Sequence, residues 1–285
     1  MINNLLGRGV EEVIVKEHLE EELRVGKKLR IKFGIDPTSP DIHLGHTVPL
    51  RKLRQFQQLG HQVALIIGDY TACIGDPTGR SEERKHLSIE EVKVNMRNYL
   101  DQAGKVLDLK ATEVHYNSTW FTKDGLSAII QAAGSGTIQQ MLHRAYFKNR
   151  WDAGVYISVM ELMYPLLQVY DSVIVKADVE IGGTDQLFNL LAGRRVQRHF
   201  GMKEQDVLTL KLLVGLDGVE KMSKSKNNYI ALNDPPKIMF GKVMSVPDEL
   251  IDEYYTLCTD VDPSTSSGQA PREAKLELGK IIVDM

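Results

Sequence analysis

Two segments in the first quarter of the chain carry the hydrophobic patterns of buried strands. The segment LRIKFGID, Leu29–Asp36, alternates apolar residues with polar or small ones, as strands do. The segment VALIIGD, Val63–Asp69, is a continuous apolar run, which is typical of a parallel strand covered on both faces. We therefore predict two neighbouring parallel strands.

The segment between these strands has a helical pattern. In TVPLRKLRQFQQLG the apolar residues recur at helical spacing, and the pattern ends at Gly60. Pro49 is compatible with a helix only in the first turn, where backbone N–H groups have no intrahelical partner. The helix is therefore predicted to begin near His46 or Thr47.

Strand, helix and strand together predict a βαβ unit, whose ligands bind beyond the carboxyl ends of the strands. The segment DPTSPDIHLGH, which contains His43 and His46, lies at that end of the first strand. The unit has no G-x-G-x-x-G motif, and the chain has no G-x-x-x-x-G-K-[ST] motif. An ordinary dinucleotide-binding fold and a P-loop enzyme are therefore disfavoured.

A second helix carries a polar stripe. In SVMELMYPLLQVYDSV, Ser158 and Glu161 have the spacing of a capping box, which predicts a helix beginning near Ser158. At helical geometry Tyr164, Gln168 and Asp171 lie within roughly 60° of one another. Because the rest of this face is apolar, the stripe indicates a polar ligand.

The segment that follows, SVIVKADVEIGGTDQLFNLLAGRRV, has the pattern of a strand, a glycine turn and a helix. Thr184 or Asp185 is the predicted N-cap of this helix. Gly182 and Gly183 carry no side chain, so a ligand could approach the backbone closely there.

Composition narrows the possible classes of protein. The chain has 285 residues, of which 42% are hydrophobic, and its net charge is −3. It is therefore expected to be globular, and any nucleic acid would have to bind to local basic patches. Cys73 and Cys258 form neither a disulfide framework nor a zinc motif, and no segment has the pattern of an export signal or a membrane span, so a cytoplasmic location is expected.

Three interpretations of His43 and His46 remain open on the residues alone. They could begin a metal site, they could be structural, or they could bind an anion together with the free N–H groups of a helix N-terminus. The segment GLDGVEKMSKSKNN raises a similar choice for Lys221, Lys224 and Lys226. These lysines form either a solvated turn or a mobile loop that closes over a polyphosphate.

Five motifs together resemble one family. GIDPTSPDIHLGH, GDPTGRSEER, YPLLQVYD, GGTDQLFN and KMSKS occur in the order found in the bacterial tyrosyl-tRNA synthetases, which are class I aminoacyl-tRNA synthetases. Each motif alone is weakly specific, whereas the ordered set is highly specific. The resemblance implies an enzyme that activates tyrosine with ATP and transfers it to tRNA(Tyr), with Mg²⁺ accompanying ATP and pyrophosphate.

The resemblance also implies roles in binding ATP. His43 and His46 would stabilise the phosphates in the transition state, Lys221 and Lys224 would close over the pyrophosphate, and Gly45 would leave backbone exposed to adenine. Arg80 and Arg84, the arginines of GDPTGRSEER, would approach the same phosphates from the opposite side. The other implied ATP-binding residues are Asp36, Thr38, Gly183, Asp185, Met222 and Ser223. No protein metal ligands are implied.

For the amino acid, the resemblance places Asp76, Tyr164 and Gln168 around the α-ammonium, with Gln186 nearby, and Asp171 on the phenolic hydroxyl. A carboxylate and neutral acceptors suit an ammonium, and a buried carboxylate left unpaired by phenylalanine would be costly.

One position departs from the better-known bacterial branch. Lys32 aligns with a tyrosine that helps to bind the phenol there, so a second partner of the phenol is not identified. The GGTDQ loop instead resembles the second bacterial branch. A tryptophanyl-type synthetase remains an alternative, although Asp171 argues against it. A non-charging, RNA-binding or adenylate-forming paralogue is another.

The implied fold class is α/β, a Rossmann-like parallel sheet with helices on both faces, a helical insertion and the start of an α-helical C-terminal region. We expect a catalytic domain at residues 1–220, with an insertion at about residues 115–160 for dimer and acceptor-stem contact. Residues 221–285 would hold the KMSKS loop and the first helices of the next region. The anticodon-binding part lies outside this expected catalytic fragment, and a homodimer is expected by resemblance.

Overall fold

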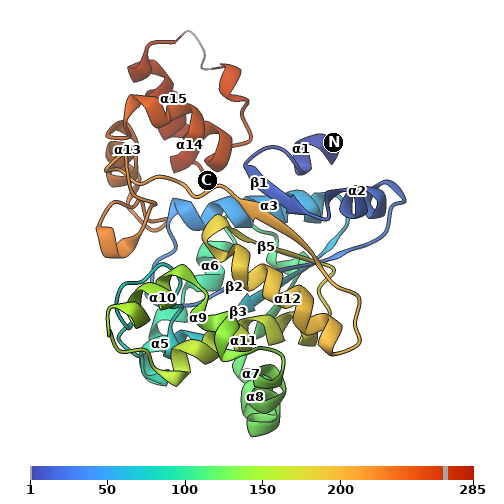
Figure 1. The fold of residues 1–285 in the computed structure, drawn as a ribbon. Helices are drawn as coiled ribbons and strands as arrows, with labels where there is room; N and C mark the ends of the chain where they lie inside the picture. The colour runs from blue at the N-terminus through green and yellow to red at the C-terminus, as the bar shows by residue number, and fades with distance from the viewer. Residues whose placement is uncertain (1, 266–268) are drawn as a thin grey trace.

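The computed structural model describes residues 2–265 and 269–285 and contains one six-stranded sheet (Figure 1). The strand order is β1-β6-β5-β2-β3-β4, and only β1 is antiparallel to its neighbour. The strands are β1 (Val10–Ile14), β2 (Arg30–Ile35), β3 (Gln62–Ile67), β4 (Thr112–Tyr116), β5 (Val179–Gly183) and β6 (Asp206–Leu210). The two strands predicted first are therefore β2 and β3, and they are parallel neighbours.

Fifteen helices are described in the same part of the chain. They are α1 (Ile2–Leu5), α2 (Lys16–Arg24), α3 (Leu44–Gln58), α4 (Thr71–Ile74), α5 (Ile89–Met96), α6 (Tyr99–Ala103), α7 (Ser118–Lys123), α8 (Gly125–Gly134), α9 (Ile138–Leu142), α10 (Ala145–Asp152), α11 (Val159–Ile174), α12 (Leu187–His199), α13 (Pro236–Met244), α14 (Ile251–Cys258) and α15 (Pro271–Val283). Short 3₁₀ turns are η1 (Leu109–Ala111), η2 (Thr184–Gln186), η3 (Lys224–Lys226), η4 (Asp248–Leu250) and η5 (Pro263–Thr265).

The sheet is covered on both faces, as predicted. Alternate residues of β3 show this, because Val63 and Leu65 belong to one hydrophobic cluster while Ala64 and Ile66 belong to another. The first cluster includes the apolar side of α3 and continues into α14 and α15, and the second includes α11. The predicted α/β architecture is therefore confirmed.

Helix α3 begins earlier than its sequence predicts. It starts at Leu44 with His43 as N-cap, so Pro49 is the sixth helical residue rather than a first-turn residue. The predicted start at His46 or Thr47 is wrong because a tertiary contact extends the helix: the Leu44 N–H donates to the Ile230 carbonyl at 3.0 Å. Pro49 cannot donate a hydrogen bond four residues back, which leaves the Gly45 carbonyl without its helical partner.

The helix with the polar stripe begins at the predicted residue, whereas the helix after the glycine turn does not. Helix α11 has Ser158 as N-cap, and the capping box with Glu161 is present. After β5 the chain first makes the 3₁₀ turn η2, and Gln186 is the N-cap of α12. Neither Thr184 nor Asp185 caps α12, because both residues lie in that 3₁₀ turn.

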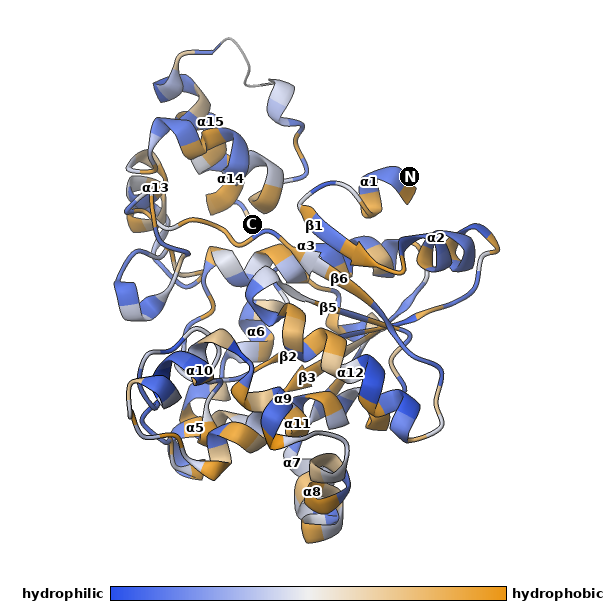
Figure 2. Cartoon of the chain, in the orientation of Figure 1, coloured by the Kyte–Doolittle hydropathy of each residue, from blue (hydrophilic) through white to orange (hydrophobic). Residues whose placement is uncertain are grey.

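Helices α7–α10 lie between β4 and α11, within the residues where the insertion is expected. Buried residues on α7 and α8, among them Trp120, Phe121 and Ala128, pack against α11. Several large apolar side chains of the insertion nevertheless remain exposed, including Leu126, at 71% exposed. Figure 2 shows α8 as a largely hydrophobic helix at the end of the molecule opposite α15.

Arg8 joins the N-terminal segment to the C-terminal helices. Its Nη2 atom donates to the carbonyls of Tyr255, Thr259 and Val261 at 2.9, 3.0 and 2.6 Å, and its Nε donates to the Thr256 carbonyl at 3.1 Å. The guanidinium thus holds the N-terminal segment against the last turn of α14 and the residues that follow it.

Candidate active site

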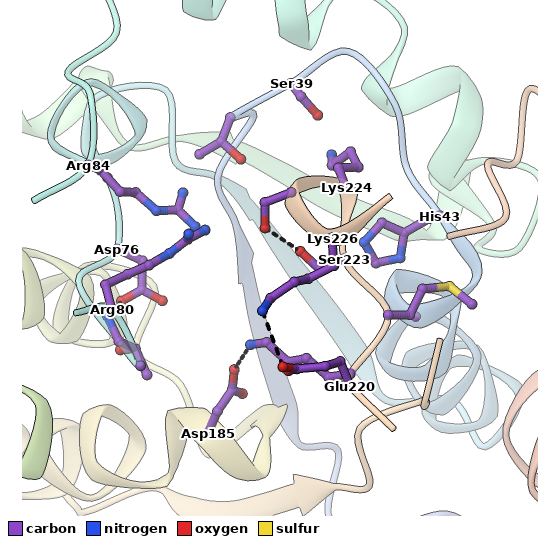
Figure 3. A pocket seen from close by; sticks show the side chains of 18 of the residues that line it. Ser39, His43, Asp76, Arg80, Arg84, Asp185, Glu220, Ser223, Lys224 and Lys226 are labelled. Atoms are coloured by element: carbon purple, nitrogen blue, oxygen red, sulfur yellow. Dashed lines mark hydrogen bonds and ion pairs between the residues drawn. The ribbon is translucent and has the colours of Figure 1, made fainter. Parts of the chain in front are cut away.

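A cavity of about 970 Å³ opens where β2 and β3 end. One wall is the turn into α3, which carries His43 and His46; a second wall is the loop that carries Arg80 and Arg84; and the 221–226 loop forms the third. Figure 3 shows Arg80 and Arg84 on one side of the cavity, facing His43 and the lysine loop on the other. Side chains from three distant parts of the sequence therefore surround one space.

The two histidines are neutral, and their rings are in contact at a tilt of 45°. Their ring centroids lie 3.8 Å apart, and His46 Nδ1 accepts a hydrogen bond from the His43 N–H at 3.2 Å. Because Nδ1 is an acceptor, the proton of the neutral ring lies on Nε2. Burial, followed by the nearby Lys224, lowers the pKa of His43 to about 3, and burial, followed by His43, lowers that of His46 well below its usual value. His46 therefore offers a neutral N–H donor to the cavity.

Gly45 lies between these histidines for a steric reason. A Cβ atom at this position would lie 3.0 Å from Cε1 of the His43 ring and 3.6 Å from Cβ of Met222. Any larger residue would therefore displace the histidine or the lysine loop.

The lysine loop is ordered by polar contacts. Asn228 accepts a hydrogen bond from the Ser223 N–H at 2.7 Å, and Lys224 Nζ donates to the Asp41 carbonyl at 2.6 Å. Lys221 pairs with Asp185 at 2.5 Å. Burial lowers the pKa of Lys224 to about 8, although the nearby Asp41 opposes this shift. The loop thus holds cations at the cavity mouth rather than pointing them into solvent.

A smaller cavity of about 280 Å³ lies beside the first and shares part of its wall, including Thr38, His46 and Asp76. The polar stripe of α11 lines this second cavity, as its helical spacing predicted. Tyr164 donates its hydroxyl proton to Asp36 Oδ2 at 2.8 Å. Burial raises the pKa of Asp36 to about 7, and hydrogen bonds from Thr71 and Tyr164 oppose that rise.

Asp171 lies in the smaller cavity and is 3% exposed. Its carboxylate accepts hydrogen bonds from the Trp120 indole N–H at 3.0 Å and from the Asn117 amide at 3.5 Å. Burial raises its pKa to about 7, while the nearby Lys32 charge opposes that rise. Two donors do not use all the lone pairs of a carboxylate, so Asp171 can still accept a ligand hydroxyl.

Lys32 is fully buried, and its ammonium lies under the polar stripe of α11. Its Nζ atom donates to Glu180 at 2.6 Å, to the Ser172 hydroxyl at 2.9 Å and to the Gln168 carbonyl at 3.0 Å. All three ammonium protons therefore have protein acceptors. Lys32 does not replace the missing tyrosine as a partner for a phenol.

The two cavities together are lined by every residue for which the resemblance implies a catalytic or substrate-binding role. The larger cavity is lined by Thr38, His43, Gly45, His46, Asp76, Arg80, Arg84, Asp185, Lys221, Met222, Ser223 and Lys224. The remaining six, Asp36, Tyr164, Gln168, Asp171, Gly183 and Gln186, line the smaller one. Asp36 and Gly183, which are expected beside ATP, line the smaller cavity, while Asp76, which is expected beside the amino acid, lines both.

Sequence reasoning missed Asn117, Trp120, Arg144 and Asn189. Asn117 and Trp120 follow β4 and reach Asp171 only through the folding of the insertion against α11. No local pattern marks Asn117, Trp120 or Arg144, because their contacts with Asp171 and Asn189 each span more than forty residues. Asn189 ends the GGTDQLFN motif, but the motif alone does not assign it a contact.

No group of three or more metal-ligating side chains occurs among residues 2–265 and 269–285. In the same residues, no helix combines the length and apolar character needed to cross a membrane.

Comparisons with known proteins agree with this geometry. A family model described as "tRNA synthetases class I (W and Y)" matches residues 24–280. A tyrosine–tRNA ligase of Dehalococcoides mccartyi is 55% identical over 264 residues, which cover 93% of this chain and 66% of that protein. One of Aquifex aeolicus is 50% identical over 283 residues, covering 98% of this chain and 72% of that protein.

The fold has solved counterparts as well. A tyrosyl-tRNA synthetase from Archaeoglobus fulgidus, solved with L-tyrosine, superimposes with a TM-score of 0.78 at 23% identity, covering 99% of this chain and 96% of the other. The fold is that of a class I aminoacyl-tRNA synthetase. Among these enzymes, the chain belongs to the family of bacterial tyrosine–tRNA ligases.

Proposed function

We propose that this chain activates tyrosine with ATP, forming tyrosyl-adenylate and pyrophosphate, and transfers the tyrosyl group to tRNA(Tyr). The observation that carries the proposal is the shared wall of the two cavities. A tyrosine in the smaller cavity, with its phenol at Asp171, would direct its carboxylate toward the larger one. ATP in the larger cavity would present its α-phosphate at the junction.

The chemistry requires positioning and charge stabilisation rather than a protein nucleophile. The tyrosine carboxylate attacks the α-phosphorus, and the bond from that phosphorus to the bridging oxygen breaks as pyrophosphate leaves. His46 donates a neutral N–H to the phosphates, and Arg80, Arg84, Lys221 and Lys224 stabilise the negative charge that develops on the leaving group. The other residues named for ATP and tyrosine would line the two substrates.

Magnesium would enter with ATP rather than occupy a protein cage. The carboxylates of the cavity wall do not gather into a cation site, since no three metal-ligating side chains cluster among the described residues. Asp185 instead pairs with Lys221, and Asp76 accepts a hydrogen bond from Gln186. The ion would supply further charge stabilisation to the phosphates, and its oxygen ligands would come from the phosphates and water.

Transfer to tRNA and dimerisation are proposed for the insertion. Several of its large apolar residues are exposed, among them Leu126, Ile138 and Trp151, and exposed apolar side chains suit contact with a second copy of the chain. On α12, Arg194 and Arg198 both pair with Glu204, so we assign these two arginines to a structural ion-pair group rather than to contact with tRNA phosphates. We place the protein in the cytoplasm, where the free thiols Cys73 and Cys258 would persist.

We further propose that residues 1–220 carry both substrate cavities except the lysine loop, and that residues 221–285 supply this loop and its helical support. One hydrophobic cluster includes residues from both parts, among them Leu65 and Leu278. The loop is therefore attached to the same core as the histidines it faces.

Amino-acid-dependent exchange between ATP and pyrophosphate tests the proposal. Tyrosine should support exchange, whereas tryptophan and phenylalanine should not. His46→Ala and Lys224→Ala should each lower kcat by about a hundredfold or more, since each removes a donor from developing charge. Lys237→Ala, at an exposed lysine outside both cavities, is the matched control and should retain wild-type exchange. Exchange supported by tryptophan alone would contradict the proposal.

A further inference from the structure

Arg144 is an arginine buried next to the amino-acid cavity, in the insertion that precedes α11. It is 4% exposed, and its guanidinium carbon lies 3.9 Å from the centre of the Phe188 ring. One guanidinium nitrogen donates to the Tyr146 hydroxyl, and the other terminal nitrogen donates to Asn189 Oδ1. A guanidinium stays charged and can only donate, so the atom of Asn189 that faces it must be the oxygen.

Asn189, which is 1% exposed, extends this contact to two glutamines. Its Nδ2 atom donates to Gln168 Oε1 at 2.7 Å and to Gln186 Oε1 at 2.8 Å. Gln186 Nε2 then donates to Asp76 Oδ2 at 2.7 Å. A continuous row of hydrogen bonds therefore runs from Arg144 to Asp76.

The two ends of this row determine the orientation of every amide in it. A side-chain amide alone can rotate by half a turn and exchange its donor and acceptor at little cost in shape. Here a cation that only donates stands at one end, and a carboxylate, Asp76, that accepts stands at the other. Rotating any of the three amides would bring two donors or two acceptors together.

We propose that Arg144 and Asn189 are positioning residues that set the donor and acceptor pattern of Gln168 and Gln186 toward the ammonium group of the amino acid. The inference rests on the tyrosine-binding role proposed above. In the observed orientation the Gln168 oxygen keeps a free lone pair for an ammonium. In the reversed orientation both glutamines would exchange oxygen for NH₂, and Gln186 would present its oxygen to Asp76.

Asn189→Asp provides the sharpest test because it keeps the shape of the side chain and replaces its NH₂ donor by a carboxylate oxygen, while Arg144 can pair with the added negative charge. The new oxygen would face Gln168 Oε1 and Gln186 Oε1, so both amides must rotate. We expect the Kd for tyrosine, measured by equilibrium dialysis without ATP, to rise about tenfold or more, since a hydrogen bond to a charged group is lost. The KM for ATP should stay within about twofold of wild type.

Gln197→Glu is the matched control, since it places the same change on the same helix outside the row. Gln197 is buried on α12 and donates to the Ala177 carbonyl at 2.8 Å. This variant should lose stability without a change in the Kd for tyrosine. If folded Asn189→Asp bound tyrosine as wild type does, the inference would be wrong.

A second pair of variants tests the inference independently in case Asn189→Asp does not fold. Arg144→Lys keeps a cation that only donates and should retain tyrosine affinity within about threefold, whereas Arg144→Met should weaken it about tenfold. Equal affinities for these two variants would overturn the inference.

Hydrogen exchange of the Gln186 side-chain amide, measured by NMR, supplies a readout that needs no substrate. Protection should persist in Arg144→Lys and disappear in Arg144→Met. A wild-type protein that shows this protection but does not bind tyrosine would contradict the proposed function alone. Equal protection in both variants would contradict the positioning role alone.

Discussion

At the scale of single residues, the main feature of the smaller cavity is Asp171, a buried carboxyl group whose ionisation is costly. Asp171 is almost fully enclosed, and its pKa rises to about 7 because burial outweighs the opposing effects of Lys32, Trp120 and Asn117. A bound phenol would add one more donor to the ionised form. Ligand binding should therefore favour ionisation of this carboxyl group.

The raised pKa of Asp171 predicts a dependence of stability on pH. The folded state holds this proton up to about pH 7, while the unfolded chain releases it near 3.8, so folding loses stability as the pH rises between these values. Between pH 5 and pH 8 the wild type should lose roughly 2 kcal/mol more unfolding free energy than Asp171→Asn does. Urea unfolding at both pH values measures this, and parallel losses in the two proteins would contradict it.

Candidate site residues could be predicted from the sequence where they belong to a short motif. His43, His46, Lys221 and Lys224 stand in short motifs of fixed spacing, and the structure brings them to one cavity. The partners of Asp171 and the row that begins at Arg144 could not be predicted, because these contacts join residues without a common local pattern.

At the scale of elements, one buried ion pair connects two strands and a helix. Lys32 on β2 contacts Glu180 on β5, and the same ammonium donates to the Ser172 hydroxyl and the Gln168 carbonyl on α11. Glu180 also accepts a hydrogen bond from Ser172 at 3.2 Å. The group therefore sets how α11, with its polar stripe, lies on the sheet.

Removing one charge of this pair should cost much more unfolding free energy than removing both. Lys32→Met leaves Glu180 buried without its cation and should cost about 3–5 kcal/mol of unfolding free energy. Combining it with Glu180→Gln should recover about half of this loss or more, since no buried charge remains unpaired. A double-mutant cycle by urea unfolding at pH 7 measures the coupling, and additive losses would show that the pair is not coupled.

Element types could be predicted more reliably than their ends. The sequence patterns of β2, β3 and α11 were sufficient to predict the type of each element, because the burial pattern and the capping box are local features of the sequence. The start of α3 was displaced by the Ile230 contact, and the N-terminus of α12 by a 3₁₀ turn, and both effects depend on the folded surroundings.

At the scale of the whole molecule, the insertion leaves an apolar surface at the end of the molecule remote from α15 (Figure 2). Leu126 and Ile130 lie one turn apart on α8 and are 71% and 59% exposed. Exposed apolar residues at this spacing form a continuous stripe on a helix.

Charges on this stripe should disrupt the proposed homodimer. Light scattering of the wild type should give about twice the chain mass of 32.1 kDa. Leu126→Asp combined with Ile130→Asp should give the mass of one chain, because burial of two carboxylates in an apolar interface is unfavourable. The same changes should leave the melting temperature nearly unaltered, since both side chains are exposed. A wild-type protein with the mass of one chain would contradict the dimer.

The contacts of Arg8 have a consequence for the order in which the chain folds. Residue 8 is synthesised early, yet the acceptors described above for its guanidinium lie at residues 255–261, and β1 pairs with β6 nearly two hundred residues later. Contacts at such sequence separation slow folding, because a long loop must close before they form. During synthesis on the ribosome, β1 and the Arg8 guanidinium should therefore lack these partners until most of the chain has emerged, although Lys52 can already donate to the Leu5 and Arg8 carbonyls. This is the stage at which a chaperone could bind the unpaired strand.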